Sequence, residues 1–212
     1  MANKYDIEVR LLAITGLVKE ILSKSGGTKD SDSEQLIEYA GRLCWDTTEK
    51  LGTNPDRIQE WISVGHESVI EHASATFYIR ASRVLTHELV RHRLASYSQR
   101  SQRYVSESVP KYIEPREIKS GKQNAEKIFI EAMNNAWSAY NQLIDLGVNR
   151  EIARYVLPNA CETQIVMTMN FRELRHFIKL RTSSRALPEM RAVAGKVRRI
   201  MKEKAPRVFA DL

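Results

Sequence analysis

The chemically richest stretch of the 212-residue chain is Arg91–Tyr104, which reads RHRLASYSQRSQRY. Planar guanidinium groups bind phosphate through two parallel hydrogen bonds, and loop backbone N–H groups can complete such an anion site. These residues therefore favour recognition of a phosphorylated ligand. Two alternatives stay open: a solvated basic surface, and a nucleic-acid groove in which Tyr97 and Tyr104 would stack on bases between the arginines.

The spacing of the histidines argues against a catalytic metal centre. His87 and His92 are five positions apart, and His66 and His72 are six positions apart. A helical zinc site needs two histidines at i and i+4, on one face of the helix. The two cysteines have no CxxC spacing, so we expect two reduced thiols rather than a redox or metal pair.

The composition favours anionic partners. The formal net charge is +7 and the isoelectric point is near 9.4, with arginine concentrated in residues 89–106 and 172–199. The N-terminal residues contain no apolar signal region, and the longest apolar runs are only a few residues long. We therefore expect a cytoplasmic protein that has no membrane partner.

The elements that position Arg91–Tyr104 can be predicted from hydrophobic periodicity and capping residues. Alternation with a period of two predicts strands, whereas a period near 3.6 predicts helices. Strands are expected at residues 5–12, 74–80 and 164–169. Helices are expected from Ser33 to Leu43, from Ser82 to about Leu94, from about Lys122 to Leu146, around Arg150–Val156, from the capping box of Asn170 and Glu173 to about Arg181, and last from Pro188.

The order of these elements predicts the fold class. Strands and helices follow one another unevenly, without the regular alternation of a doubly wound sheet. We expect an α+β fold, with an antiparallel sheet flanked by helices, as a single domain over residues 1–212 that includes a helical part. Residues 97–104 have no clean period, so they are expected to form a loop.

The polar spacing of Arg91–Tyr104 resembles the signature of the flavin-dependent thymidylate synthase family. There, RHR is followed by seven residues, then serine, one residue, arginine and tyrosine, and Ser101 takes the serine position. Three further segments are similar to family elements and follow the family's order. They are His66–His72, similar to the HES motif, Arg154–Asn159, similar to an ArgxxLP element, and Asn170–Arg181, similar to the C-terminal block.

The resemblance implies an enzyme that methylates dUMP to dTMP. It implies FAD as the cofactor, NADPH as the reductant of the flavin, and methylenetetrahydrofolate as the one-carbon donor, released as tetrahydrofolate. It also implies a homotetramer with active sites between subunits and no nucleic-acid partner. An Arg/Tyr-rich nucleic-acid-binding module is the alternative from another class, and a flavoprotein of different chemistry on the same fold is a third possibility.

The resemblance also implies which residues form the site. Arg181 would be the catalytic group, because a guanidinium that is always protonated can stabilise an anion that develops on the uracil ring. No residue is expected to bind a metal. The FAD site would contain Ser68, Arg91, His92, Arg93, Gln99, Asn170, Arg172 and His176. The dUMP site would contain Glu88, Arg91, Gln99, Arg100, Ser101, Gln102, Arg103, Arg154 and Arg181.

Three positions depart from the family pattern. Glu88 stands where several members have glutamine, and Gln99 stands where those members have glutamate, so the summed charge is unchanged. Arg185 stands where histidine was expected, which argues against a catalytic role at that position. Ser101 has no histidine or carboxylate within four residues to act as its base, so we expect it to position dUMP rather than attack it.

Overall fold

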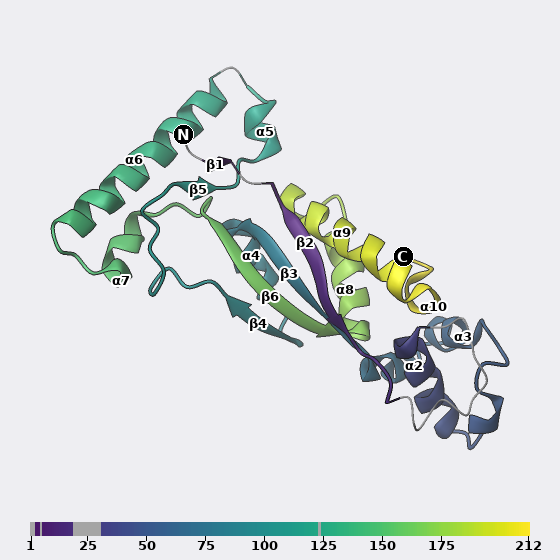
Figure 1. The fold of residues 1–212 in the computed structure, drawn as a ribbon. Helices are drawn as coiled ribbons and strands as arrows, with labels where there is room; N and C mark the ends of the chain where they lie inside the picture. The colour runs from purple at the N-terminus through teal and green to yellow at the C-terminus, as the bar shows by residue number, and fades with distance from the viewer. Residues whose placement is uncertain (1–2, 5, 19–30, 123) are drawn as a thin grey trace. The chain divides into compact units, whose positions relative to one another are not determined.

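A four-stranded sheet organises the computed structural model, which describes residues 3–4, 6–18, 31–122 and 124–212 (Figure 1). The strand order is β2-β3-β6-β4, with bounds Glu8–Ile14, Ser74–Ser82, Glu162–Asn170 and Ala95–Gln99. A second sheet pairs β1 (Asn3–Lys4) with β5 (Lys111–Tyr112) in parallel. The main sheet is antiparallel and flanked by helices, so the predicted α+β class is confirmed.

The three predicted strands are confirmed because their alternation matches the period of a pleated strand. In β3, Ala75, Phe77 and Ile79 are buried, while the residues between them are half-buried. The hydroxyl groups of Thr76 and Thr168 are hydrogen-bonded at 2.9 Å on that half-buried face. The strand that corresponds to the predicted 5–12 is β2, which runs later, from Glu8 to Ile14, and residue 5 lies outside the described residues.

Two strands continue directly into capped helices. β3 ends at Ser82, whose Oγ accepts a hydrogen bond of 3.1 Å from the backbone N–H of Leu85 and opens α4 (Arg83–Leu89). β6 ends at Asn170, whose side chain accepts a bond of 2.8 Å from the N–H of Glu173 and opens α8 (Phe171–Arg181). A side chain that satisfies an N–H group of the first turn stabilises the helix by about 1 kcal/mol, so both helix starts are fixed by their caps.

The chain forms two compact units, and each strand of the main sheet contributes to both of them. Unit 1 comprises residues 1–8, 79–91 and 98–165, and unit 2 comprises residues 9–78, 92–97 and 166–212. A single domain over residues 1–212 stays a prediction.

Unit 1 is organised around α6 (Ala125–Asp145). This helix aligns Met133, Trp137 and Tyr140 on one buried face, a spacing of four and three residues that is typical of an amphipathic helix. Met133 and Trp137 pack with Tyr112 and Cys161 in a hydrophobic core. The other helices of unit 1 are α4 (Arg83–Leu89), α5 (Arg116–Lys119), α7 (Arg150–Ala153) and the 3-10 helix η3 (Arg154–Val156).

Unit 2 contains the remaining described helices, among them α2 (Asp32–Leu43) and α10 (Pro206–Phe209). Phe171 at the start of α8 packs edge-on against Phe209 of α10, with ring centroids 5.3 Å apart. Arg207 of α10 donates from its side chain to Glu38 (3.1 Å) and from its backbone to Glu34 (2.6 Å), both on α2. The elements are α2 (Asp32–Leu43), η1 (Thr48–Lys50), α3 (Arg57–Ser63), η2 (Glu67–His72), α8, α9 (Pro188–Lys204) and α10 (Pro206–Phe209).

Several predicted boundaries are wrong. The helix after Ser82 ends at Leu89 instead of about Leu94, and α2 begins at Asp32, before Ser33. Pro188 opens α9 as predicted, but α10 follows it. Residues 97–99, which belong to the predicted loop 97–104, form the end of strand β4 (Ala95–Gln99) instead. β4 is the last strand in the sheet order, and its alternate half-buried side chains are Ala95, Tyr97 and Gln99, so the polar side chains hide the period.

Among the described residues, no helix combines the length and the apolar composition that crossing a membrane would require.

Candidate active site

A group of charged and polar side chains lies in unit 2, and we call it the histidine cluster: His92, Glu173, His176 and Arg181. The imidazole of His92 is only 5% exposed. Its Nδ1 lies 3.0 Å from Oε1 of Glu173, and its Nε2 lies 3.0 Å from Nε of Arg181. The ring of His176 lies 5.9 Å from the ring of His92. The structure therefore brings together three residues that the sequence assigned to the site.

The contacts of His92 define its protonation state. Burial lowers the pKa of His92 below 6.5, Arg181 lowers it further, and the hydrogen bond to Glu173 partly opposes the shift. The Nε–H of Arg181 can donate only to an unprotonated Nε2, since arginine has no acceptor. His92 is therefore neutral, with its proton on Nδ1 directed at the Glu173 carboxylate.

Neighbouring rings hold His92 in place. The hydroxyl of Tyr97 donates to the backbone carbonyl of His92 at 2.9 Å. Burial raises the pKa of Tyr97, and the nearby Glu173 carboxylate raises it further, so the phenol keeps the proton that it donates. Phe177 packs edge-on against the imidazole with centroids 5.2 Å apart. Because α8 supplies Glu173, His176, Phe177 and Arg181, one helix positions most of the cluster.

The ligand atoms of His92, Glu173 and His176 lie within 4.8 Å of one another, close enough to hold a metal ion. Both nitrogens of His92 are already engaged, one by Glu173 and the other by Arg181. An ion at this place would replace one of these bonds and lie near the Arg181 guanidinium. The arrangement thus favours a polar network over a metal centre.

A second group of predicted residues lies where η2 packs against the start of α8. Arg172 is paired with Glu71 (Nη1 to Oε1, 2.6 Å) and with Glu67 (Nε to Oε2, 3.5 Å). The hydrogen bond to Glu71 is the main cause that raises the pKa of Arg172. Ser68 lies between these two glutamates in η2, and Asn170 caps α8. The guanidinium of Arg172 is thus exposed but already neutralised by carboxylates.

Most of the other predicted residues lie in unit 1, and we call residues 99–104 together with Arg154 the arginine loop. At its start, the side-chain amide of Gln99 donates to the hydroxyl oxygens of Thr86 (3.1 Å) and Thr163 (3.2 Å). The hydroxyl of Thr86 donates to the carbonyl of Arg83 at 3.2 Å, so its oxygen accepts from Gln99. The side chain at position 99 must therefore donate a hydrogen bond to Thr86. A glutamine amide can do so, which is a physical reason for glutamine at this position.

The exposed part of the arginine loop is organised by Glu151. Nε of Arg103 lies 3.0 Å from the Glu151 carboxylate, and Nε of Arg154 donates to the Glu151 carbonyl at 3.1 Å. Ser101 Oγ accepts from the backbone N–H groups of Arg103 (3.1 Å) and Tyr104 (3.4 Å), which closes a tight turn. Two arginines predicted for the dUMP site are thus brought together by one residue.

Arg100 and Gln102 point into the protein interior instead. Arg100 forms an ion pair with the buried Glu107, whose carbonyl accepts a bond of 2.8 Å from the Trp137 indole. Burial raises the pKa of Glu107, and the charge of Arg100 opposes the shift. Gln102 is buried near Cys161, whose thiol pKa is raised to about 12 by burial. Arg100 therefore stabilises the loop through an ion pair on its buried side, and Gln102 is enclosed there with it.

The remaining predicted residues lie around the end of α4. Glu88 is in its last turn, and the backbone N–H of Arg91 donates to the Glu88 carbonyl at 3.2 Å. From the helix predicted to run to about Leu94 we would expect Glu88 and Arg91 on one helix face, but α4 ends at Leu89 and Arg91 lies in the following turn. The side chains of Arg91, Arg93 and Arg185 are exposed.

The sequence reasoning missed Glu173 as a functional residue. The spacing of Asn170 and Glu173 indicated a capping box, in which the glutamate would return to the backbone of the cap. Asn170 does cap the helix, but the Glu173 carboxylate binds His92. Tyr97, Glu107 and Glu151 were also missed. Of these four residues, only Glu173 could have been found from the sequence. It lies close to Asn170 and Arg172, within the block that resembles the family.

Comparison with known proteins shows the family to which the chain belongs. The family model described as "Thymidylate synthase complementing protein" matches residues 28–207. A flavin-dependent thymidylate synthase of Geobacter sulfurreducens is 44% identical, covering 85% of this chain and 82% of the relative. Relatives of the same name from Corynebacterium efficiens and Mycobacterium leprae are 38% and 40% identical, each covering the whole chain and 92% of the relative. The chain belongs to the flavin-dependent thymidylate synthase family.

Proposed function

We propose that this protein synthesises dTMP by methylating dUMP, with FAD as its cofactor. In this proposal NADPH reduces the flavin, methylenetetrahydrofolate supplies the carbon and leaves as tetrahydrofolate, and the reaction takes place in the cytoplasm. Membership of the family and the names of the relatives support dTMP synthesis, a flavin and a folate. The contacts of Arg181 support the way in which the uracil ring is activated.

The observation that carries the proposal is the hydrogen bond between Arg181 and a neutral histidine. Nε of Arg181 is held by Nε2 of His92, and the opposite side of that imidazole is held by Glu173. A side chain fixed in this way keeps its guanidinium plane in one orientation before the substrate arrives. Such preorganised charge is more effective than a flexible cation, because no reorganisation is needed as the reaction proceeds.

Arg181 would activate the uracil ring. Carbon 5 of dUMP has to become nucleophilic before it bonds to the methylene carbon, so negative charge must develop toward O4 or N3 of the ring. An oriented guanidinium stabilises that charge through planar N–H donors and cannot lose its own proton near neutral pH. Cys161 is unsuited to covalent activation, because burial raises its pKa to about 12 and keeps the thiol protonated.

The arginine loop would bind the phosphate of dUMP. Arg103 and Arg154 meet at Glu151, and the Ser101 turn fixes the backbone beside Arg103. The ion pair between Arg103 and Glu151 is half-exposed, so it contributes little stability by itself. A phosphate can therefore take the place of the carboxylate at Arg103, since a dianion binds a guanidinium more strongly.

The exposed cations fit the demands of FAD. Arg91 and Arg93 present guanidinium groups to solvent, and Arg172 lies beside the capped start of α8, where a helix favours anions. When bound, FAD would supply the hydride that completes the methyl group. Arg172 would hold the pyrophosphate by releasing Glu71 or Glu67, which are both partly exposed partners. The exposed ring of His176 would contact the same ligand.

The proposed function is tested by colour and by genetic rescue. The purified protein is expected to be yellow, with flavin absorption near about 375 and 450 nm, at one FAD per chain. Its gene should allow a thymidine-requiring strain to grow without thymidine. Colourless protein that cannot be reconstituted with FAD, together with failure of the rescue, would overturn the proposal.

A homotetramer with shared active sites is part of the proposal and has its own test. Ser68→Trp would block the predicted FAD site, and Arg181→Ala would remove the catalytic group. If residues from different subunits build each site, mixing the two inactive variants should restore part of the activity. A lack of rescue, after subunit exchange has been verified by mass spectrometry, would contradict shared sites.

A further inference from the structure

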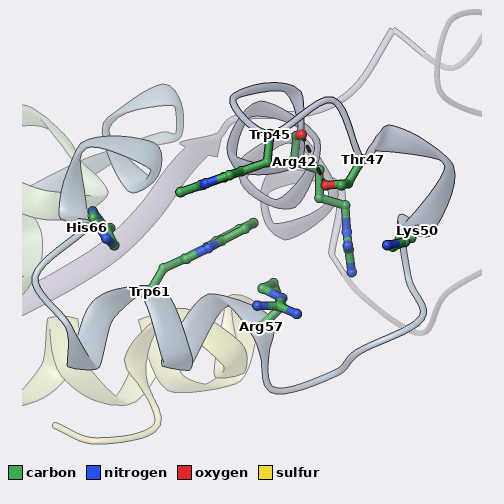
Figure 2. Close-up of a pocket in the computed structure, with 7 residues that line it drawn as sticks. All are labelled: Arg42, Trp45, Thr47, Lys50, Arg57, Trp61 and His66. Carbon is green, nitrogen blue, oxygen red and sulfur yellow. Dashed lines mark hydrogen bonds between the residues drawn. The ribbon is translucent and has the colours of Figure 1, made fainter.

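A pocket that contains none of the proposed site residues lies in unit 2. It is formed by the end of α2, the turn that follows α2, α3 and the segment before η2 (Figure 2). It encloses about 390 Å³ and is lined by Arg42, Trp45, Lys50, Arg57, Trp61 and His66, together with one threonine. This volume is at the lower end of the range of small-ligand sites, about 300–1,000 Å³. It suits one nucleoside or a group of similar size.

The aromatic wall of the pocket is rigid and accessible. Trp45 is 54% exposed, whereas Trp61 is buried. The two indoles are nearly parallel, with an interplanar angle of 9° and centroids 6.1 Å apart. The rings of His66 and Trp45 pack edge-on, with their centroids 6.0 Å apart. Figure 2 shows the parallel rings, with the imidazole beside them. An exposed indole that is held from two sides offers a ready surface on which a planar ring can stack.

The backbone of α2 leaves room for this aromatic wall. Gly41 lies in α2 against the Trp61 ring, and a Cβ atom added there would lie 2.4 Å from two ring carbons. Only glycine allows the indole to approach the helix this closely. The position of Trp61, and through it that of Trp45, is therefore set by direct contact between a ring and a helix backbone.

The polar wall of the pocket is cationic. Arg42, Lys50 and Arg57 line it, and no carboxylate is among the lining residues. Arg57 forms an ion pair with the exposed Glu60, with its Nη1 atom 3.0 Å from Oε2 of the carboxylate. Arg42 is buried and bonds Glu38 at 2.7 Å, so its charge is compensated within the protein. Lys50 and Arg57 are therefore the lining cations that are best placed to bind an anionic ligand.

We infer that this pocket binds a phosphorylated purine nucleoside. The purine ring would stack on Trp45, and the phosphate would be bound by Lys50 and Arg57, which reach the pocket from η1 and α3. Guanidinium and ammonium groups together favour a dianionic phosphate over a single carboxylate. On the proposed function, one source of such a group is the 2′-phosphoadenosine end of NADPH, and the other is a free purine nucleotide.

Direct binding to the purified full chain tests the inference without requiring dTMP synthesis. The probe is 2′,5′-ADP, titrated by calorimetry. Trp45→Ala and Lys50→Gln are each expected to weaken its binding by about tenfold, and Trp45→Phe, which keeps an aromatic ring, should retain most of the affinity. Lys127→Gln on α6 removes an exposed positive charge in unit 1 and is the matched control, with no change expected.

Further titrations distinguish the sources and the competing ligand. If the source is NADPH, Trp45→Ala should raise the KM for NADPH in flavin reduction, while single-turnover dTMP formation by dithionite-reduced enzyme stays unchanged. If 5′-AMP binds as tightly as 2′,5′-ADP and the KM is unchanged, the ligand is a free purine nucleotide. Equal affinity of all variants for 2′,5′-ADP would overturn the inference. So would binding of folate at Trp45 without any binding of 2′,5′-ADP.

Discussion

The histidine cluster and the arginine loop both contain residues of Arg91–Tyr104, but they hold their polar groups in opposite ways. His92 and Glu173 are buried and bonded to each other, and His92 also orients Arg181. Arg103 and Glu151 are half-exposed, and such a pair contributes only about 0–1 kcal/mol. Removing one partner of a buried hydrogen bond costs about 1–3 kcal/mol, because the other polar group is left without a partner.

This difference indicates that the two groups of residues have different roles in the candidate site. A buried and fully bonded group changes little when a ligand arrives, so it suits a role that requires a fixed orientation. An exposed arginine can exchange a carboxylate for a phosphate at low cost, so it suits capture of a charged substrate. We therefore assign chemistry to the histidine cluster and binding to the arginine loop, and the following substitutions test that assignment.

The largest effect is expected at Arg181. Arg181→Ala should slow methyl transfer by about 10²–10³-fold, the loss usual for one preorganised donor to a developing anion. Arg181→Lys should recover little, because an ammonium group lacks the planar donors and cannot reproduce the bond to His92. The measurement is single-turnover conversion of dUMP by prereduced enzyme with methylenetetrahydrofolate, which separates the transfer from flavin reduction.

A smaller effect, on binding instead of turnover, is expected at Ser101. Ser101→Ala removes the oxygen that accepts from the backbone of Arg103 and Tyr104, so the turn loosens. The KM for dUMP should rise about tenfold, equivalent to about 1.4 kcal/mol, while turnover at saturating dUMP is kept. If Ser101→Ala abolished turnover while Arg181→Ala left it nearly intact, the two roles would be reversed and covalent activation by the serine would be favoured.

The smallest effect is a pH dependence of stability that comes from His92. Its pKa in the folded protein lies below the ordinary 6.5, mainly because of burial, so the unfolded chain takes up the proton first as pH falls. The free energy of unfolding should therefore decrease below about pH 6.5, by at most about 1.4 kcal/mol per pH unit.

Urea unfolding between about pH 7 and pH 5 measures this slope. His92→Gln keeps a polar side chain that does not titrate, so the slope of the variant should be shallower than that of the wild type. Asp211, whose pKa is lowered by Arg175, titrates below this window and adds the same slope to both proteins. Identical slopes would show that His92 does not contribute.

Much of the fold could be predicted because the informative residues act locally. The alternation of β3 and β6 and the caps at Ser82 and Asn170 depend on neighbours only a few residues away. β4 could not be predicted, since its half-buried side chains include Tyr97 and Gln99, and only pairing in the sheet makes it a strand. The early end of α4 has no glycine or proline to mark it.

The site shows the same limit. The resemblance identified His92, His176 and Arg181, and the structure places them in one cluster. It did not reveal that Arg100 and Gln102 are turned toward the interior, because nothing in the sequence marks Glu107 and Cys161 as their buried neighbours. Partners separated by 81 residues, as His92 and Glu173 are, are defined by the tertiary structure alone.

Gly41 has a consequence for engineering of the protein. Glycine inside a helix costs about 0.5–1 kcal/mol relative to alanine, so Gly41→Ala would be a natural choice for making α2 more robust. Here the added methyl group would meet the Trp61 ring, a rigid group that can yield only by moving as a whole. The helix therefore contains a residue of low helix propensity at this position, because only glycine lets the indole pack against the helix backbone. A thermostabilised variant obtained at this position would be expected to lose the aromatic wall in the same step.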